Sequence, residues 1–435
     1  MVSFTLLLYS ATLVLLLIWV SNRHSMLSIY PLTLFYMLAE VPFLFISYKY
    51  PSILYQSALA WVDDIENTYI LHVSLRVIFL VCFSCVCLFY KTKASLNQRR
   101  IKIKLRYLVF LLIVILASYL SFLSQVGGLA LILANMSTKT ELIRGSGITR
   151  LLFVYSTMLL ASVSVCWYAD SDQSILKKIF LFLLMISMFL LLASYGERKN
   201  SIVFILIFVM SWHVWVKPLS LFSFKALFAM SILIAFSSLA PPLRESGAAV
   251  KYALEPTMLF YDAIPHLGEL FRRFSDIDVS IFMLNYFNDY DRYFFLSTLP
   301  NFFTGFIPSF LYPGKPPLDE AVVVYNLASG VNPGVYAPFE NFIPVGWPLS
   351  RYTSGWVQFG ISGVFLYSFA TSFLLVMFNN FTMKNNSPFV LPLYVNIAST
   401  GLGISNAYIF NLLIAIAVIL MLYCFYRVLT ILSRS

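Results

Sequence analysis

Apolar residues run in long stretches along this chain, and short polar segments separate them. A helix of about 20 apolar residues crosses the hydrocarbon core of a bilayer. Stretches of about that length predict an all-α polytopic integral membrane protein with about eleven transmembrane helices, at 3–20, 31–47, 69–90, 107–124, 151–168, 179–194, 201–216, 226–240, 355–378, 389–405 and 407–426.

Composition supports this fold class. The 435 residues are 60% hydrophobic and 11% charged, whereas a soluble domain is about 25% charged. A soluble globular enzyme and a disordered chain are therefore excluded, and the lipid bilayer is the expected environment. The first apolar run lacks a basic start and a small-residue cleavage site, so we interpret it as a span. The five cysteines lie in apolar runs; no disulfide, metal site or cofactor is predicted.

The basic residues predict the orientation. Seven basic residues and no acid lie between Lys91 and Arg106, which places this segment in the cytoplasm, the N-terminus outside and the C-terminus inside. The cytoplasmic segments then hold fifteen basic and two acidic residues, a net +13, and the rest holds fourteen basic and seventeen acidic residues, a net −3. The total of +10 is thus a topology signal, and nucleic acid is not an expected partner.

One long segment interrupts the spans. We predict three regions: 1–240 with helices 1–8 and short loops, 241–350 as a large extracytoplasmic loop, and 351–435 with helices 9–11. The loop pattern predicts an interfacial helix over 265–274 that opens at Pro265, and another over 278–296 capped by Asp278. Nine prolines between 300 and 348 predict an irregular lid without helices.

Two basic groups are candidate anion sites at the outer boundary. Arg198 and Lys199 follow a charged turn and open a span, where helix N–H groups and the helix dipole favour anions. Lys139 and Arg144 lie in a glycine-containing loop over 125–150. Contact with lipid headgroups explains the first group equally well. It explains the second group less well, because positive charge is normally depleted in outer loops. Inside the spans, Glu40 and Arg76 predict a structural ion pair, with a proton relay as the alternative.

A third group lies near the ninth span. Lys315 belongs to the string Pro308 to Pro316, and Arg351 stands just before the span. Three aromatic residues are candidates to stack on sugar rings, although an interfacial aromatic belt explains them too: Trp347, Tyr352 and Trp356.

At these residues the sequence resembles the Wzy-type O-antigen (oligosaccharide repeat unit) polymerases. The family's G-x-[K/R] turn is matched by Gly196 to Arg198, and its proline-rich string by Pro308 to Pro316, with Ser309 where many members have Arg. A glycine-containing helix start is similar to Trp356 through Gly363. Many members carry a Glu roughly where Ser354 stands here.

The resemblance implies a multi-pass enzyme of the bacterial inner membrane. It implies a glycosyltransferase that joins undecaprenyl-diphosphate-linked oligosaccharide repeat units at the periplasmic face in lipopolysaccharide biosynthesis. Other expected partners are a chain-length regulator and a flippase of the same pathway. The diphosphate calls for cations, for which the candidates are Arg198, Lys199, Arg351, Arg144, Lys139 and Lys315.

The reaction also needs a group that takes the acceptor proton. Glu340 is the first candidate, because it lies closest to the final-helix motif, and Asp319, Glu320 and His266 follow. Alternatives for the whole chain are a flippase or other transporter of lipid-linked oligosaccharides, an O-antigen ligase, and a non-enzymatic scaffold. A transporter predicts polar residues at mid-membrane and repeat-related halves.

Overall fold

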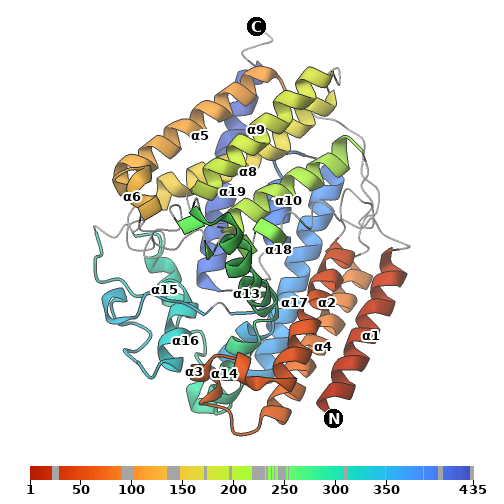
Figure 1. Cartoon of the computed structure of the whole chain (residues 1–435), viewed down its shortest axis with the longest axis vertical. Coiled ribbons are helices and arrows are strands. Elements are labelled where there is room, and N and C mark those ends of the chain that lie inside the picture. Colours follow the sequence, from red (N-terminus) through yellow and green to blue (C-terminus); the bar gives the residue numbers. More distant parts are fainter. Residues whose placement is uncertain are drawn as a thin grey trace. The chain divides into compact units, whose positions relative to one another are not determined.

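The computed structural model describes residues 1–21, 29–90, 102–134, 147–170, 174–194, 198–217, 231, 234–236, 238–239, 241–242, 251–252, 254–307, 311–347, 349–385, 387–399 and 405–431 (Figure 1). These residues form helices, turns and loops, and no strand occurs among them. The predicted all-helical class is therefore confirmed.

Eight helices within the described residues are long and apolar enough to cross a membrane. They are α1 (Val2–Ser21), α2 (Ile29–Lys49), α4 (Ile65–Phe89), α5 (Leu105–Val126), α8 (Gly147–Asp170), α9 (Ile175–Ser194), α17 (Thr353–Asn385) and α19 (Asn406–Ile431). The predicted spans 201–216 and 389–405 correspond to shorter helices, α10 (Arg198–Trp215) and α18 (Leu391–Ser399). The predicted span 226–240 lies largely outside the described residues, so the count of eleven stays a prediction.

The chain divides into two compact units. The first comprises Met1–Ala94, Phe271–Asn380 and Ile397–Leu413, and the second comprises Ser95–Leu270, Phe381–Asn396 and Ile414–Ser435. Each unit therefore combines segments that are far apart in the sequence.

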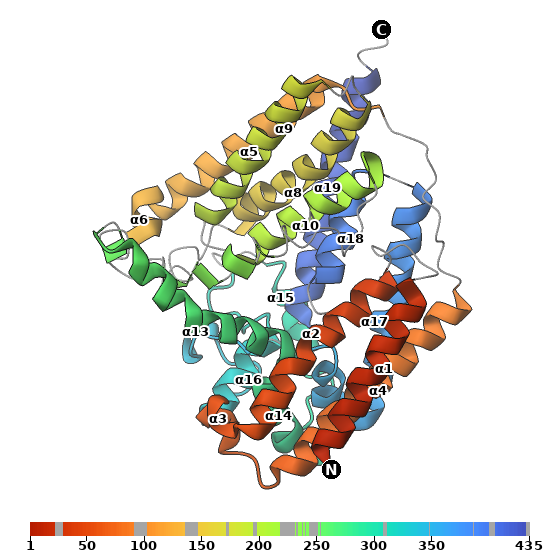
Figure 2. The same ribbon diagram turned by 45° about the vertical axis from the view of Figure 1, so that its right-hand side comes forward.

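In the first unit, α1 packs against α2 and α4 (Figure 2). Leu6 and Leu13 of α1 are fully buried, whereas Leu7 and Leu15 are 58% and 68% exposed. A helix that buries one stripe and exposes large apolar side chains on the other suits a hydrocarbon environment.

Three polar contacts lie around the beginning of α4. The N-terminal ammonium of Met1 pairs with Glu66 at 3.4 Å, the Tyr55 amide donates to Asp278 at 2.7 Å, and the Thr68 side chain bonds to Asn285. At the other end of α4, Asn380 Nδ2 donates to the Tyr90 carbonyl at 3.2 Å. The N-terminus and the loop residue Asn285 therefore lie near the beginning of α4, and in the sequence the basic segment 91–106 follows its other end. Which end faces outside stays a prediction.

Two predicted interfacial helices differ from the structure. α13 covers Pro256–Ser275, so Pro265 lies inside it and does not open it. α14 covers Ile277–Tyr286. Asp278 does not cap α14, because its carboxylate accepts the Tyr55 amide; the residue before the helix is Asp276, in a left-handed conformation with φ +48°.

α14 enters the bundle and does not lie on its surface. The carbonyl of Ser275, just before α14, accepts a hydrogen bond from Arg76, and Asn285, near the end of α14, contacts Thr68. α14 therefore runs antiparallel to α4, and every residue from Ile277 to Leu284 is buried.

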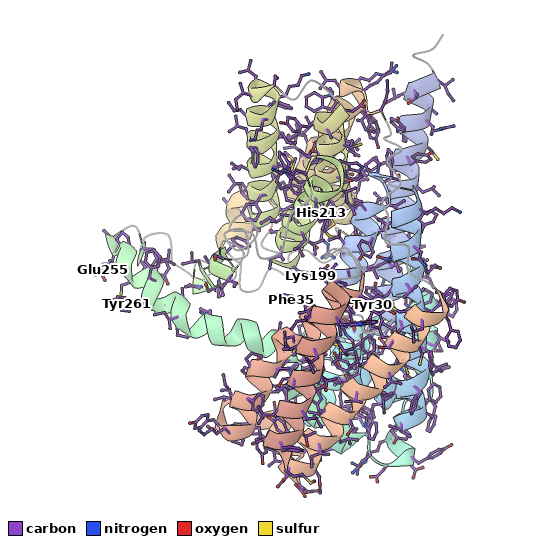
Figure 3. The ribbon with its side chains drawn as sticks, turned by 90° about the vertical axis from the view of Figure 1, so that its right-hand side faces the viewer. Tyr30, Phe35, Lys199, His213, Glu255 and Tyr261 are labelled. Atoms are coloured by element: carbon purple, nitrogen blue, oxygen red, sulfur yellow. The ribbon has the colours of Figure 1, made fainter. Side chains whose placement is uncertain are left out.

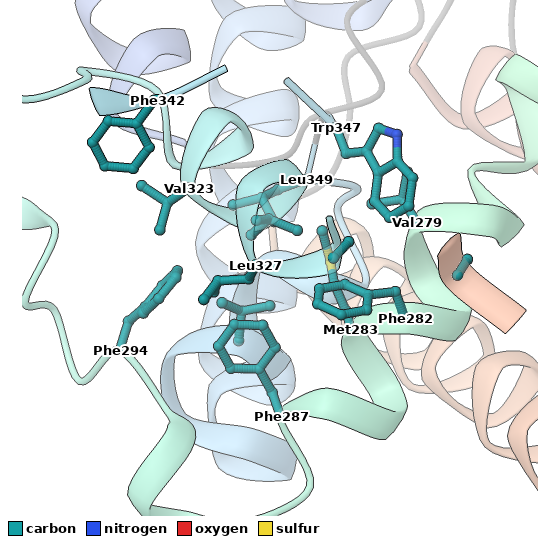
Figure 4. Packing of buried hydrophobic residues seen from close by; sticks show 14 residues of the cluster. Val279, Phe282, Met283, Phe287, Phe294, Val323, Leu327, Phe342, Trp347 and Leu349 are labelled. Carbon is teal, nitrogen blue, oxygen red and sulfur yellow. The ribbon is translucent and has the colours of Figure 1, made fainter. Parts of the chain in front are cut away.

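The proline-rich segment is also more ordered than predicted. α15 (Leu299–Thr304) and α16 (Glu320–Ala328) form within it, and Asp319 caps α16 by accepting the Ala321 amide at 3.1 Å. The prediction that this segment excludes helices was wrong, because its prolines leave 318–332 free. α16 packs into an apolar core, shown in Figure 4, with residues that include Phe282, Phe287, Val323, Leu327 and Trp347.

α17 is interrupted near its start. Phe359 and Gly360 have non-helical dihedral angles, and Gly360 takes φ +60°. The amides of Phe294 and Phe295 donate to the carbonyls of Val357 and Gln358 at 3.0 and 3.2 Å. The interruption thereby separates a short first segment, 353–358, from the long apolar part of the helix.

In the second unit, α5 and α10 both pack against α8, which is buried over most of its length. The Tyr107 hydroxyl of α5 donates to the Leu422 carbonyl of α19 at 3.0 Å, and the Ser162 hydroxyl of α8 bonds to the Pro388 carbonyl. α5 ends at Gly127, whose φ of +86° favours glycine.

Candidate functional site

A cluster of charged and aromatic side chains lies buried in the first unit. Its centre is the ion pair between Glu40 of α2 and Arg76 of α4. Glu40 Oε2 lies 2.9 Å from Arg76 Nε and 2.8 Å from Arg76 Nη2, and both side chains are almost fully enclosed. The structural ion pair predicted from the sequence is therefore confirmed.

Arg76 has two further partners. Its Nη2 donates to the Ser275 carbonyl at 2.8 Å, and its Nη1 contacts Nε2 of His72, one helical turn earlier. The Ser275 carbonyl stands at the C-terminal end of α13, where free carbonyls carry partial negative charge. Arg76 therefore joins α2, α4 and the α13–α14 junction.

Arg351 lies in an aromatic cage beside this pair. Its guanidinium carbon is 4.5 Å from the ring centre of Tyr36, 5.1 Å from that of Phe79 and 5.7 Å from that of Tyr352. Arg76 also lies 4.5 Å from the Tyr352 ring, and the Tyr352 hydroxyl donates to Glu40 at 3.4 Å. Cation–π contacts and burial thus hold two guanidinium groups around one tyrosine ring.

Asp276 is the second carboxyl group near the cluster. Burial, together with the negative charges of Glu40 and Asp278, raises the pKa of Asp276 to about 8, although Arg76 and Arg351 act to lower it. A pKa of about 8 keeps this carboxyl protonated at pH 7. The guanidinium groups of Arg76 and Arg351 and the carboxyl group of Glu40 lie together beside Asp276, and Asp278 is a further carboxyl group that interacts with Asp276.

The cluster lies well inside the bundle. Arg76 is eleven residues after Ile65, which places it about 16 Å along the helix at 1.5 Å per residue. The apolar surface of α1, which begins beside the start of α4, extends past this depth, since Leu8 and Leu15 are 59% and 68% exposed. Ionisable groups at such a depth are expensive and indicate a functional site.

Of the other predicted residues in this unit, several have structural contacts. Lys315 Nζ donates to the Ile307 carbonyl at 3.0 Å, and Asp319 caps α16. Glu340 is exposed in a short 3-10 helix, Phe339–Asn341.

The three aromatic residues predicted to stack on sugar rings pack against other side chains of the protein. Trp347 is 7% exposed and stacks on Tyr55 with ring centres 5.8 Å apart. Tyr352 is 2% exposed between the two arginines, and Trp356 packs against the apolar core. Trp356 is only partly buried, and the sugar-stacking role of the three residues stays a prediction.

The remaining predicted residues belong to the second unit. Arg198 is the first residue of α10, which confirms its predicted position at a helix start, and Lys199 is exposed beside it (Figure 3). His266 lies on α13 and is partly buried. Lys139 and Arg144 lie outside the described residues. The joint diphosphate site of Arg198 with Arg351 therefore stays a prediction.

The sequence analysis did not identify four members of the cluster: Tyr36, His72, Phe79 and Asp276. The spacing of His72 and Arg76, four residues apart on one span, is a signal that places both on one helix face. Asp276 has no such local signal, because 200 residues separate it from Arg76. The described residues contain no group of three His, Cys, Asp or Glu that fits a metal ion.

Comparison with known proteins gives no assignment: no family model, no curated protein and no solved structure matches this chain.

Proposed function

We propose that this protein is a glycosyltransferase of the bacterial inner membrane that polymerises undecaprenyl-diphosphate-linked oligosaccharide repeat units at the outer face. The observation that supports it best is the pair of buried guanidinium groups, Arg76 and Arg351, which lie around the ring of Tyr352. Arg76 also donates to the Ser275 carbonyl, at the point where the long loop enters the apolar helices. A diphosphate on a lipid carrier combines a strong anion with an apolar chain and needs both environments.

Transfer of a sugar from a diphosphate carrier requires positive charge near the leaving group. The acceptor hydroxyl oxygen forms a bond to the anomeric carbon of the donor, and the bond from that carbon to the phosphate oxygen breaks. The electron pair leaves with the diphosphate, where negative charge increases, and fixed cations stabilise it. Arginine stays charged at any relevant pH and binds two phosphate oxygens at once.

The acceptor proton needs a carboxylate or a histidine to take it. Asp276, with a pKa of about 8, is mostly protonated at pH 7, Asp319 is engaged as a helix cap, and His266 on α13 is partly buried. Glu340 is exposed, so it remains the first candidate base in the proposed reaction.

The test is polymerisation by the purified full-length protein. Lipid-linked repeat units are incubated with the protein, and the products are separated on a gel. We expect a ladder from the wild type and none from Arg351→Ala. Arg292→Ala is the matched control, because Arg292 lies in the same loop with a 43% exposed side chain and pairs with Asp289 at 3.4 Å.

The experiment tests the polymerase function and the diphosphate site separately. If the wild type gives no ladder, the polymerase function is wrong. If Arg351→Ala gives the wild-type ladder, the polymerase function stands and the cluster is not its diphosphate site.

A transporter of lipid-linked oligosaccharides is the second candidate. The buried His72, Glu40 and Arg76 support it, because ionisable groups inside spans also mark proton and substrate pathways. The same preparation in sealed vesicles distinguishes the two. A transporter moves the intact repeat unit between leaflets without forming a ladder.

A further inference from the structure

A second buried polar cluster lies away from the arginines and centres on Glu320, the first residue of α16. The Glu320 side chain is enclosed, and the residue is 4% exposed. Its Oε2 accepts the backbone amide of Asn406 at 2.9 Å, at the start of α19, and its Oε1 accepts the Thr298 hydroxyl at 3.3 Å. One carboxyl therefore ties the loop helix α16 to a membrane helix.

The contacts continue to α17. Asn406 Nδ2 donates to the Thr298 carbonyl at 2.7 Å, and Gln358 Nε2 donates to the Thr298 hydroxyl at 3.4 Å. Gln358 Oε1 accepts the Leu296 amide at 2.8 Å. Gln358 ends the short segment of α17 that follows Arg351, so the same cluster also holds this segment against the loop.

We propose that Glu320 is a protonation-dependent anchor, which docks α16 and the 294–298 segment onto the starts of α17 and α19 when its carboxyl is neutral and weakens this docking when the carboxyl is ionised. This inference concerns the docking of the loop and does not depend on the proposed function.

The groups around the Glu320 carboxyl determine which of its protonation states favours docking. Both hydrogen-bond donors to Glu320 are neutral groups, and burial penalises the ionised form. The titratable groups that interact with it are the neighbouring Asp319, whose negative charge also disfavours ionisation, and Tyr367 of α17. Burial accordingly raises the pKa of Glu320 from 4.5 to about 7, although the amides and the Thr298 hydroxyl lower it.

The difference in the pKa of Glu320 between the docked and undocked states sets the direction and the size of the pH effect on docking. The docked state binds the proton more tightly than an undocked state whose carboxyl is in water, so docking is strongest below pH 4.5 and weakens as the pH rises to about 7 and beyond. With those two pKa values, the opening equilibrium increases about tenfold between pH 6 and pH 8.

Hydrogen exchange of the full chain in lipid nanodiscs tests this. We expect exchange in the 320–328 peptide to rise about tenfold more between pH 6 and pH 8 than intrinsic amide chemistry explains. Glu320→Gln keeps the shape without the charge, and the extra increase should disappear. Glu340→Gln, an exposed carboxyl of the same loop, should keep it.

A wild type without the extra increase, or a Glu320→Gln protein that retains it, overturns the proposal. If Glu320→Gln does not fold, Thr298→Val provides the second test. The Thr298 hydroxyl lowers the pKa of Glu320, so its loss should move the exchange transition to higher pH. An unchanged transition midpoint would also overturn the proposal.

Discussion

The Glu40–Arg76 ion pair allows a quantitative test of the buried cluster. Glu40→Gln removes the carboxylate but keeps the shape of the side chain. Arg76 then loses its charged partner at 2.8 Å, and keeps the Ser275 carbonyl. Breaking one half of a buried pair typically costs about 3–5 kcal/mol, because the remaining charge is left without compensation. We expect the lower part of this range, since the glutamine oxygen still accepts one hydrogen bond.

The double variant Glu40→Leu/Arg76→Met completes the cycle. Replacing both partners with apolar side chains removes the charge and its desolvation cost together. We therefore expect the double variant to lose less stability than either Glu40→Leu or Arg76→Met alone, with a coupling energy of about 3 kcal/mol or more.

The free energy of unfolding is measured in mixed detergent micelles by denaturant titration. The exposed pair of Arg292 with Asp289, at 3.4 Å, is the control, and its loss should change stability by less than about 1 kcal/mol. Additive single effects at the Glu40–Arg76 pair, each below 1 kcal/mol, would refute the reasoning. A folded double variant that makes no polymer would show that the charges serve activity as well as stability.

The other predictions concern topology and the candidate residues. A cysteine introduced at Ser329 should be labelled from outside and one at Ser95 should not; the reverse pattern refutes the orientation. Arg198→Ala should abolish polymerisation at normal protein abundance, whereas Arg198→Lys should keep part of it, because charge survives without the bidentate geometry; a full ladder from Arg198→Ala makes Arg198 a headgroup contact. Polymer formation that survives Glu340→Gln unchanged excludes Glu340 as the base. Phe260 of α13 is 66% exposed on an apolar helix face, so Phe260→Asp should weaken binding of an α13 peptide to lipid vesicles, and unchanged binding would contradict an interfacial role.

The sequence predicted those features that depend on local pattern or on large energies. Spans follow from the length of apolar runs, and the Glu40–Arg76 pair follows from the cost of charge inside a span. The nine prolines over 300–348 predicted a lid without helices, but they are unevenly spaced. The stretch between Pro317 and Pro333 contains no proline, and α16 forms there. Average composition therefore hides a helix of nine residues.

The candidate site was harder to predict, because its parts come together only in three dimensions. Arg351 was recognised as a cation beside a span, but its cage uses Tyr36 and Phe79 from other helices. Asp276 looks like an ordinary loop carboxyl until α14 carries it to the depth of Arg76. Long-range contacts of this kind leave no periodicity in the sequence.

The inward path of α14 has a consequence for biogenesis. Ten residues are too short to span a bilayer, so the insertion machinery has no reason to retain this segment as a span. Arg76 is synthesised 199 residues before the Ser275 carbonyl that it binds, but only 36 residues after Glu40. Pairing with Glu40 can therefore stabilise the arginine in the membrane while α2 and α4 emerge together. The Ser275 carbonyl is synthesised only after the chain has passed through the helices of the other unit, which makes docking of α14 a late, post-insertional step in assembly.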